Sequence, residues 1–326
     1  MSIQKLNATF GITDVLRFEQ TDSGLVLAHI ATSNARATVC LQGAHLTHWQ
    51  PVDERPVLFT GARSRLLPGE AIRGGIPLVF PWFGPYAGAA SDKGGYGLHG
   101  FARTAPWTLF SAGLSGDELQ LTFSLSPDKQ SRALGFDGFH LAYTLRVGRS
   151  LELELATHNE GARTLCFEEA LHTYFAIEDI ERASLIGLAG MPYLDGADCF
   201  TEKRQAGAEL RFRRRTDSIH LGTVATCVLR DEGNKRLIVL EKSGSRTTVV
   251  WNPGIETADA ISGLGPGDWR KFVCVEIANA RTDAIALVPG ATHHMAARIT
   301  VQSDRSLCSR CCGSKEEVSK QLHRAV

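Results

Sequence analysis

The chain has 326 residues, of which 43% are apolar and 21% are charged, and its 35 basic residues balance its 35 acidic ones. This composition indicates an ordinary soluble globular protein that is long enough for one large hydrophobic core or two modest ones. Because the net charge is zero, no summed positive field attracts polyanions, and we expect no nucleic-acid partner.

The N-terminus and the apolar runs argue against secretion and membrane insertion. The first residues, MSIQKLNATF, lack the apolar stretch of a signal peptide. The longest apolar runs fall far short of the ~20 residues that a membrane span needs. We therefore expect a cytoplasmic protein that is monomeric and has no membrane partner. The one basic run, RFRRR at 211–215, is more typical of a solvated loop than of a phosphate contact.

Segments with strand chemistry follow one another along most of the chain. In the clearest of them Leu151, Leu153 and Leu155 alternate with polar residues, which is a period of two. No segment carries a sustained helical stripe with caps. The pattern predicts an all-β protein, a large antiparallel β-sandwich that forms a single domain over residues 1–302. The predicted strands are 25–30, 37–43, 119–125, 140–147, 150–159, 227–231, 236–242 and 247–252.

The segment from Arg73 to Arg103, RGGIPLVFPWFGPYAGAASDKGGYGLHGFAR, is the most unusual part of the chain. Its glycines and prolines prevent a regular helix or strand, yet it is too apolar to be a solvated linker. Packing of residues 76–83 would hold Arg73, His99 and Arg103 as a rigid polar cluster. Such a cluster suits a small anionic ligand.

Three further positions carry side chains that chemistry could use, although a structural interpretation is the commoner one for each. His172 lies in the apolar run FEEALHTYFAIEDI, where a histidine is more often a satisfied core residue. Asp217 in RRTDSIH is typical of a turn or cap. Trp251 in VVWNPGIE is either a core residue or a platform for a sugar ring.

Glu276 interrupts the strand FVCVEIAN, residues 272–279, which is otherwise apolar on both faces. A carboxylate there is strongly desolvated unless it has a partner or a function. Desolvation raises the pKa of such a group toward the working range of a general base. For Glu276 we therefore favour the functional interpretation.

The eight cysteines fall into two groups. Three of them form C-x-x-C-C at Cys308, Cys311 and Cys312, in a polar tail over residues 303–326 that we expect to be disordered. No second ligand pair accompanies them apart from a weak candidate, His323, so we predict no metal there. The others stand singly among apolar residues and are expected to be buried, reduced thiols: Cys40, Cys166, Cys199, Cys227 and Cys274.

Several of these motifs, taken in order, resemble one family. RGGIPLVFPWFG and HGFAR, followed by LHTYFAIEDI, TDSIH, VVWNP and FVCVEIA, resemble the glucose-6-phosphate 1-epimerases, which are similar in fold to galactose mutarotases. The resemblance runs from about Gly43 to Pro289, most of the chain. It implies a β-sandwich whose cleft binds the pyranose form of a hexose 6-phosphate and interconverts its α and β anomers.

The resemblance also implies roles for single residues. His172 matches the general acid and Glu276 the general base of the family. Arg73 and Arg103 match residues that bind substrate, plausibly its phosphate. Asp217 matches a residue that holds a sugar hydroxyl, and His99 matches a histidine close to the sugar. The implied chemistry starts from an ionised Glu276 and a protonated His172, and it needs neither cofactor nor metal.

One departure and two alternatives remain at this point. Leu98 stands where some members of the family carry a glutamine that contacts the ligand, so that hydrogen bond is absent from this chain. A non-catalytic sensor of sugar phosphates could use the same fold, because fold does not fix function. A mutarotase of non-phosphorylated aldoses is the other alternative, which the arginine pair disfavours.

Overall fold

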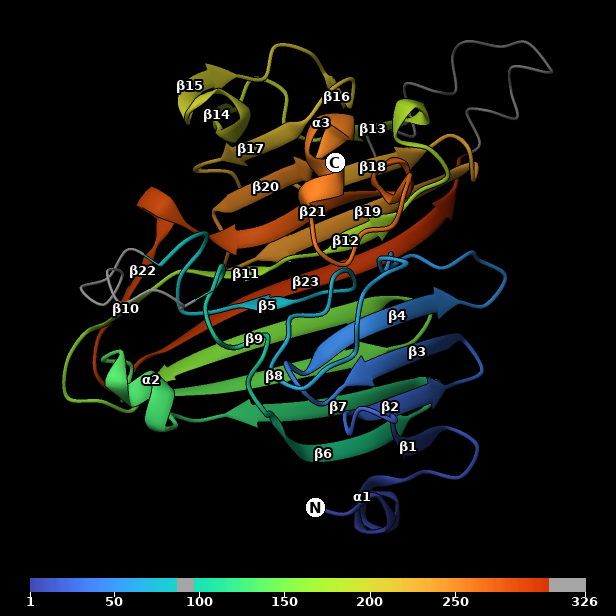
Figure 1. Ribbon diagram of the computed structural model, residues 1–326, viewed down its shortest axis with the longest axis vertical. Helices are drawn as coiled ribbons and strands as arrows, with labels where there is room; N and C mark the ends of the chain where they lie inside the picture. The colour runs from blue at the N-terminus through green and yellow to red at the C-terminus, as the bar shows by residue number, and fades with distance from the viewer. Residues whose placement is uncertain (87–96, 305–326) are drawn as a thin grey trace.

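Antiparallel strands make up most of the regular structure in the computed structural model, which describes residues 1–86 and 97–304 (Figure 1). One layer of the molecule is a nine-stranded sheet. Its strands, in spatial order, are β16 (Glu209–Arg211), β13 (Ala183–Ile186), β18 (Cys227–Asp231), β19 (Arg236–Ser243), β23 (Thr292–Ser303), β9 (Leu151–Asn159), β8 (Phe139–Val147), β7 (Glu118–Leu125) and β6 (Thr108–Ser115).

Two further sheets pack against this layer through a shared apolar core. The smaller has four strands, and the larger has eight because β12 also pairs with β21. The four-stranded sheet contains β1 (Leu16–Gln20), β2 (Val26–Ala31), β3 (Ala35–Cys40) and β4 (His45–Pro51). The eight-stranded sheet contains β15 (Thr201–Arg204), β14 (Pro192–Asp195), β17 (Thr216–His220), β20 (Thr247–Asn252), β21 (Phe272–Asn279), β11 (Glu169–Leu171), β5 (Leu78–Val79) and β12 (Tyr174–Ala176).

The remaining elements are short. A two-stranded sheet joins β10 and β22, and α1 lies beyond β1 at the N-terminal end of the molecule (Figure 1). The elements are β10 (Leu165–Phe167), β22 (Ile285–Leu287), α1 (Ile3–Phe10), α2 (Lys129–Ala133), α3 (Gly254–Thr257) and the 3₁₀ turns Ile180–Arg182, Gly196–Asp198, Ala258–Ala260, Asp268–Lys271 and Arg281–Asp283. The predicted antiparallel all-β sandwich is confirmed.

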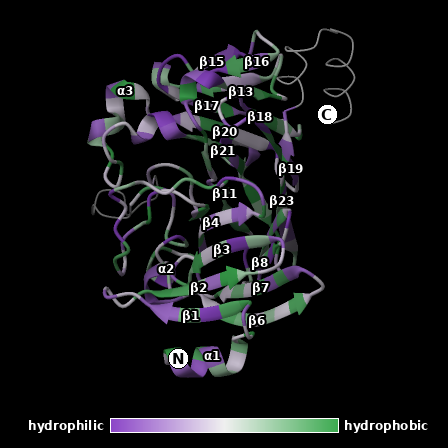
Figure 2. Ribbon diagram, turned by 90° about the vertical axis from the view of Figure 1, so that its right-hand side faces the viewer, coloured by the Kyte–Doolittle hydropathy of each residue, from purple (hydrophilic) through white to green (hydrophobic). Residues whose placement is uncertain are grey.

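The apolar side chains of the alternating pattern seen in the sequence fill the core. Along β9 every second side chain is buried, and Leu151, Leu153 and Leu155 are at most 1% exposed. Figure 2 shows the resulting bands of hydrophobic and hydrophilic residues along the strands. Each fully buried leucine contributes about 1.5–3 kcal/mol relative to an exposed one. The core between the layers is therefore built mainly from period-two strands, as predicted.

Strand β21 is buried on both faces, which positions the site described below. Val273, Val275 and Ile277 point into the core between the layers. Phe272 and Cys274 lie on the opposite face, in a small apolar cluster of their own. The prediction of a strand that is apolar on both faces is confirmed. Glu276, the polar residue on the outer face, is buried as well.

Two local expectations were wrong. Residues 3–10 form a helix, with Ser2 as its N-cap, although two turns are too short to display a sustained apolar stripe. Cys166 and Cys199 are exposed rather than buried. Cys166 is the outward residue of β10, and Cys199 ends a 3₁₀ turn with a left-handed backbone, φ 49°. An apolar neighbourhood in sequence did not place these two thiols in the core.

The C-terminal tail with Cys308, Cys311 and Cys312 lies outside the described residues, as does His323. The last strand, β23, ends at Ser303. Within the described ranges, no helix combines the length and the apolar character needed to cross a membrane.

A buried ion pair ties the end of β12 to β18 and β19. The Nε of Arg236 lies 3.0 Å from Oδ2 of Asp231, and its other nitrogens donate to the carbonyls of Arg55, Pro56 and Ala176. We expect Arg236→Met to lower the free energy of unfolding by about 3 kcal/mol, because it leaves a buried carboxylate without its cation. Urea denaturation measures this change.

An exposed arginine on β23 provides the matched control. Arg298 pairs with Glu152 and Glu241 but is half exposed. Arg298→Met should cost less than about 1 kcal/mol, since surface ion pairs contribute little. Equal losses in the two variants would mean that the Asp231 carboxylate is not desolvated in the way the structure describes.

A second buried carboxylate, Glu169 on β11, predicts a pH dependence of stability. Nε2 of His293 lies 3.0 Å from its Oε1, and this hydrogen bond raises the pKa of His293 above its usual range. The stabilisation is therefore complete below the unfolded pKa of about 6.5 and is lost as the pH rises through the raised folded value. We expect wild type and His293→Gln to differ most in urea midpoint near pH 6 and least near pH 9.

Candidate active site

A pocket of about 280 Å³ opens on the outer face of the eight-stranded sheet. Its walls combine strand residues from β12, β17, β20 and β21 with loop residues that lie far away in sequence. All six site residues predicted from the sequence line it: Arg73, His99, Arg103, His172, Asp217 and Glu276. The fold thus brings these six residues into one cavity, although they lie up to about 200 positions apart in the sequence.

Strand register brings His172 and Glu276 together. β21 pairs with β11 at Leu171 and with β12 at Tyr174, so the two residues between these strands lie opposite the centre of β21. Nε2 of His172 is 3.3 Å from Oε1 of Glu276, and their side chains are 8% and 1% exposed. Thr173 O accepts from the Val275 N–H at 3.2 Å and fixes the crossing point. An acid and a base therefore face each other at the floor of the pocket.

The surroundings set the protonation of this pair. Burial, with a contribution from Asp217, raises the pKa of Glu276 well above its ordinary value, as the sequence predicted. Burial, His99, Arg103 and Arg73 together lower the pKa of His172 well below its ordinary value. Both shifts oppose charge on the pair, whereas the chemistry implied by the family starts from an ionised Glu276 and a protonated His172.

Two half-buried arginines line the same pocket. Arg73 donates from Nη1 to the Tyr174 hydroxyl at 3.0 Å and from Nε to the Ser262 carbonyl at 3.2 Å. Arg103 donates to the Leu98 carbonyl, and burial lowers its pKa to about 10. Within residues 1–86 and 97–304, neither guanidinium forms an ion pair with a carboxylate. Partly desolvated guanidinium groups without counter-ions suit an anion that comes from outside.

His99 is held rigidly between the arginines and the His172 ring. Its backbone N–H donates to Gly84 O at 2.8 Å, and its Nδ1 accepts from the Gly84 N–H at 3.2 Å. The next residue, Gly100, has φ 72° and lies so close to the Phe80 carbonyl that any Cβ would clash. Burial and then Arg103 and Arg73 lower the pKa of His99 to about 3. The ring is neutral, and the proton resides on Nε2.

Asp217 and Trp251 complete the side of the pocket formed by β17 and β20. Oδ2 of Asp217 accepts from Nη2 of Arg215 at 3.2 Å, and burial raises the pKa of the carboxyl group. Trp251 is half-buried, and its ring lies 6.4 Å from that of His172. Trp82, by contrast, is not among the lining residues and packs against Tyr86 and Phe101. Of the two tryptophans, Trp251 is the one available to a ligand.

Tyr174, Arg281 and Phe200 are among the lining residues that sequence reasoning did not single out. Tyr174 stacks on His172 at 4.9 Å with only 10° between the ring planes, and it holds Arg73. Arg281 and Phe200 meet at the mouth, where the guanidinium lies 5.1 Å from the ring centre. The Tyr174 position could have been read from LHTYF, since it lies two residues from His172. The other two come from irregular turns that carry no local signal.

One group of side chains meets a distance criterion for metal ligands. Ligand atoms of His172, Cys274 and Glu276 lie within 4.8 Å of one another. Burial raises the pKa of the Cys274 thiol well above its usual range, so the thiol is neutral. The two neighbouring arginines add positive charge that disfavours a cation. We therefore interpret the group as an acid–base site and assign it no metal.

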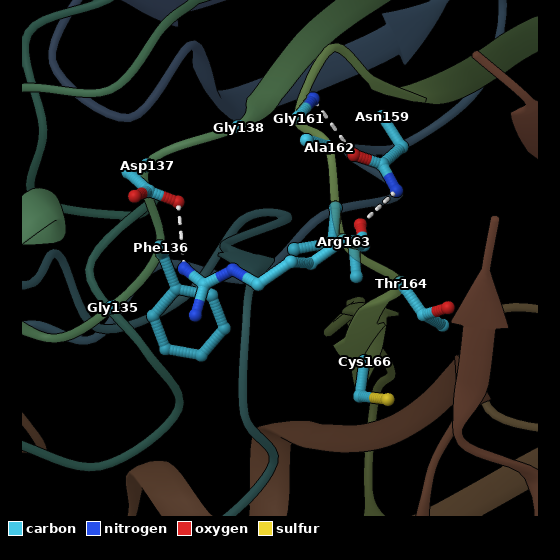
Figure 3. A pocket seen from close by; sticks show the side chains of 11 residues that line it. Gly135, Phe136, Asp137, Gly138, Asn159, Gly161, Ala162, Arg163, Thr164 and Cys166 are labelled. Carbon is cyan, nitrogen blue, oxygen red and sulfur yellow. Dashed lines mark hydrogen bonds and ion pairs between the residues drawn. The ribbon is translucent and has the colours of Figure 1, made fainter. Parts of the chain in front are cut away.

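A second cavity, lined by the turn after α2 and the loop before β10, has a different character (Figure 3). Its polar groups already bind one another: Arg163 lies 3.5 Å from Asp137, and the Asn159 amide donates to the Arg163 and Leu287 carbonyls. This cavity contains no pair suited to acid–base chemistry.

The chain is similar to known proteins over most of its length. The family model described as aldose 1-epimerase matches residues 27–300. A protein of Escherichia coli K12 named "Putative glucose-6-phosphate 1-epimerase" is 35% identical over 269 residues, which cover 82% of this chain and 88% of that protein. One of the same name from Cenchrus ciliaris is 28% identical and covers 83% of each chain.

Solved structures give the same picture for the fold. The crystal structure of a "putative mutarotase" from Salmonella typhimurium superimposes with a TM-score of 0.83 at 30% identity. The match covers 92% of this chain and 99% of that one. The overall fold is therefore shared with a mutarotase-like structure.

Proposed function

Because the chain belongs to the aldose 1-epimerase family, whose members are mutarotases, we propose that it interconverts the α and β anomers of a hexose 6-phosphate, glucose 6-phosphate above all. The observation that carries this proposal is the meeting of two features in one pocket. A buried histidine and glutamate face each other at 3.3 Å, and two half-buried arginines line the same pocket and form no ion pair with a carboxylate of the described residues.

In the proposed reaction Glu276 removes the proton from the C1 hydroxyl while His172 gives a proton to the ring oxygen. The C1–O5 bond breaks and an aldehyde forms. Rotation about C1–C2 then presents the other carbonyl face, and closure returns both protons. General acid and base catalysis supplies ~10²–10⁴-fold in rate for such transfers.

The relative position of the charged groups supports the phosphorylated substrate. In a pyranose 6-phosphate, the phosphate is joined to the ring carbon next to the ring oxygen, while the reactive hydroxyl is on the carbon at the other side of that oxygen. The acid that serves the ring oxygen should therefore be nearer the phosphate than the base is. Arg73 donates to the hydroxyl of Tyr174, whose ring stacks on that of His172 at 4.9 Å, so this arginine is tied to the acid's side of the pair.

Binding of the sugar itself falls to the other lining residues. In this proposal the Asp217 carboxylate accepts a hydrogen bond from a ring hydroxyl, and the neutral His99 ring donates one from Nε2. Trp251 offers an apolar face of the kind that packs on a pyranose. The names of the relatives from Escherichia coli and Cenchrus ciliaris point to the same substrate class.

Exchange spectroscopy by NMR tests the proposal. Purified protein is added to glucose 6-phosphate, glucose and galactose, and the rate of exchange between the anomeric proton signals is measured for each. We expect a much larger kcat/KM for glucose 6-phosphate than for the free sugars. Faster exchange of a free sugar would favour a mutarotase of non-phosphorylated aldoses, and binding without any exchange would favour a sensor of sugar phosphates.

A further inference from the structure

Arg281 is a cation of the pocket mouth that has no role in the reaction proposed above. It lines the pocket together with Phe200, and its guanidinium lies 5.1 Å from the centre of the Phe200 ring. It forms no ion pair with any carboxylate that the structure describes; Asp217, which lines the same pocket, pairs with Arg215 instead, at 3.2 Å. A guanidinium over an aromatic ring keeps its N–H donors free, since they point outward in its own plane. Arg281 is therefore able to bind an anion without giving up a partner.

The carboxylate of Glu168 ties the backbone of Arg281 to a second loop of the pocket. Glu168 is half-buried between β10 and β11. Its Oε1 accepts from the Arg281 N–H at 2.6 Å, and its Oε2 accepts from the Phe83 N–H at 2.8 Å. Arg281 has a left-handed backbone, φ 59°, which a residue other than glycine adopts only where its surroundings hold it. The two hydrogen bonds of Glu168 therefore set where the Arg281 side chain begins.

The other end of the same 3₁₀ turn is fixed as well. Oδ2 of Asp283 accepts from the Thr247 hydroxyl at 3.0 Å and from the Gly222 N–H at 3.0 Å. The backbone of Arg281–Asp283 is thus tied to its surroundings at both ends. The Arg281 side chain is the part of this turn that remains available to a ligand.

Arg281 and Arg103 flank His99. Arg103 donates to the Leu98 carbonyl, and the N–H of the next residue, His99, donates to the Gly84 carbonyl at 2.8 Å. Since the C=O and N–H of a trans peptide point in opposite directions, Arg103 and Gly84 lie on opposite sides of this peptide. Nη2 of Arg281 is 3.9 Å from the point where a Cβ on Gly84 would stand. The two guanidinium groups therefore line one pocket from either side of His99.

The shape of a pyranose 6-phosphate directs its phosphate toward the opening of this pocket. The reactive atoms, C1 and the ring oxygen, belong at the floor beside His172 and Glu276. The phosphate stands outside the ring on an exocyclic carbon, and a dianion binds most easily where part of its hydration shell can remain. Arg281 is exposed and lines the pocket, so it offers a cation of this kind.

We propose that Arg281 is a third binding residue for the phosphate of the substrate, beside Arg73 and Arg103, and that Glu168 is the positioning residue that holds it at the mouth. This inference rests on the proposed function, since it takes a sugar phosphate as the ligand. It deepens that function by assigning part of the specificity for phosphorylated sugars to a turn that follows β21.

Titration calorimetry of the full chain with a ligand that cannot react tests Arg281. The ligand is 1,5-anhydroglucitol 6-phosphate, which lacks the anomeric hydroxyl and cannot open, and its control is 1,5-anhydroglucitol. We expect Arg281→Met to weaken binding of the phosphorylated ligand roughly tenfold, because a hydrogen bond between charged groups at a solvated site is at the lower end of its range. Binding of 1,5-anhydroglucitol should not change. Unchanged affinity for the phosphorylated ligand, or equal losses for both ligands, would overturn the inference.

Two further variants separate the guanidinium from its surroundings. Arg281→Lys keeps the positive charge and should recover part of the loss. Arg246 is an exposed arginine that lies 3.7 Å from Asp283 of the same turn and is not among the residues that line the pocket. Arg246→Met should leave both affinities unchanged. A loss as large as that of Arg281→Met would mean that the turn, and not a phosphate contact, is responsible, and it would contradict the proposal.

Kinetics tests the positioning role of Glu168. Glu168→Ala should raise KM for glucose 6-phosphate and leave kcat nearly unchanged, because His172 and Glu276 stay in place. The double variant Glu168→Ala/Arg281→Met should lose no more than Arg281→Met, since both changes remove the same contact. Losses that multiply, or an equal loss for glucose, would contradict this role. Glu168→Gln, which keeps one acceptor oxygen, should show a smaller loss of the same kind and serves if the alanine variant does not fold.

The two proposals fail in different experiments. Absence of glucose 6-phosphate exchange in the wild-type protein would contradict the proposed function. The calorimetric comparison reports on Arg281 whether or not exchange occurs, because its ligands do not react.

Discussion

Replacing Glu276 with Gln is expected to lower kcat for anomer exchange of glucose 6-phosphate on the order of 10³-fold. Gln has nearly the shape of Glu, and burial raises the pKa of Glu276 and so disfavours its charge, so packing on β21 should survive the neutral substitution. What is lost is the ability to give up and take back a proton. Exchange spectroscopy at saturating substrate measures the change, and calorimetry with 1,5-anhydroglucitol 6-phosphate should find nearly unchanged affinity.

The companion variant, His172→Asn, removes the acid and should lose activity to a similar extent. The double variant should lose little more than either single one, because the two groups act as one unit. A substantial residual rate in either single variant, at saturating substrate and with an unchanged thermal midpoint, would contradict the assignment of the pair. Losses that simply multiply in the double variant would mean that the two residues act in separate steps.

The fold was predictable from the sequence wherever the strands show a regular pattern of apolar residues. Alternation in β9 and the two-sided apolar character of β21 each follow from side-chain period, which depends only on backbone geometry. The role of Glu276 was accessible for the same reason, because a carboxylate in such a strand has no solvent to face. The expectation for His172 was weaker, since an imidazole among apolar residues is common and its partner lies about 100 positions away.

The sequence could not predict how residues from distant loops interact with one another in the pocket. The protonation of His172 depends on Arg73, Arg103 and His99, which no local pattern brings within reach of it. Arg281 reaches the pocket mouth from a left-handed position, φ 59°, whose backbone N–H donates to Glu168 at 2.6 Å. Such placements come from tertiary contacts. The resemblance named the site residues, but it implied the protonation state of a bound complex and not that of the free pocket.

Two-sided burial of the eight-stranded sheet explains why this site can shift charges so strongly. The inner face of β21 packs into the core between the layers, and its outer face lies under the pocket, so Glu276 meets solvent only through the pocket that it lines. In a medium of low effective dielectric, a neighbouring charge acts over several ångströms with little screening. The pKa values of the pair therefore respond to the charges that line the pocket.

The double variant Arg73→Ala/Arg103→Ala should lower kcat/KM for glucose 6-phosphate by roughly 10²–10⁴-fold. Each arginine is expected to provide a charge-assisted hydrogen bond to the phosphate, worth about 1.5–3 kcal/mol, and both are half-buried with no competing carboxylate among the described residues. For free glucose the change in kcat/KM should be small, because that sugar brings no charge for the arginines to bind. The ratio of the two substrates, measured by the same exchange experiment, is therefore the quantity that reports phosphate recognition.

Arg17→Ala is the matched control, since it removes an exposed guanidinium on the distant strand β1 and should leave both substrates unaffected. Because Arg73 also holds Tyr174 and the Ser262 carbonyl, the single variant Arg103→Ala is the cleaner of the two and should be measured beside the double one. Equal losses for glucose and glucose 6-phosphate in Arg103→Ala would mean that this arginine shapes the pocket without binding phosphate. A loss confined to the phosphorylated sugar is the result expected if Arg103 binds the phosphate.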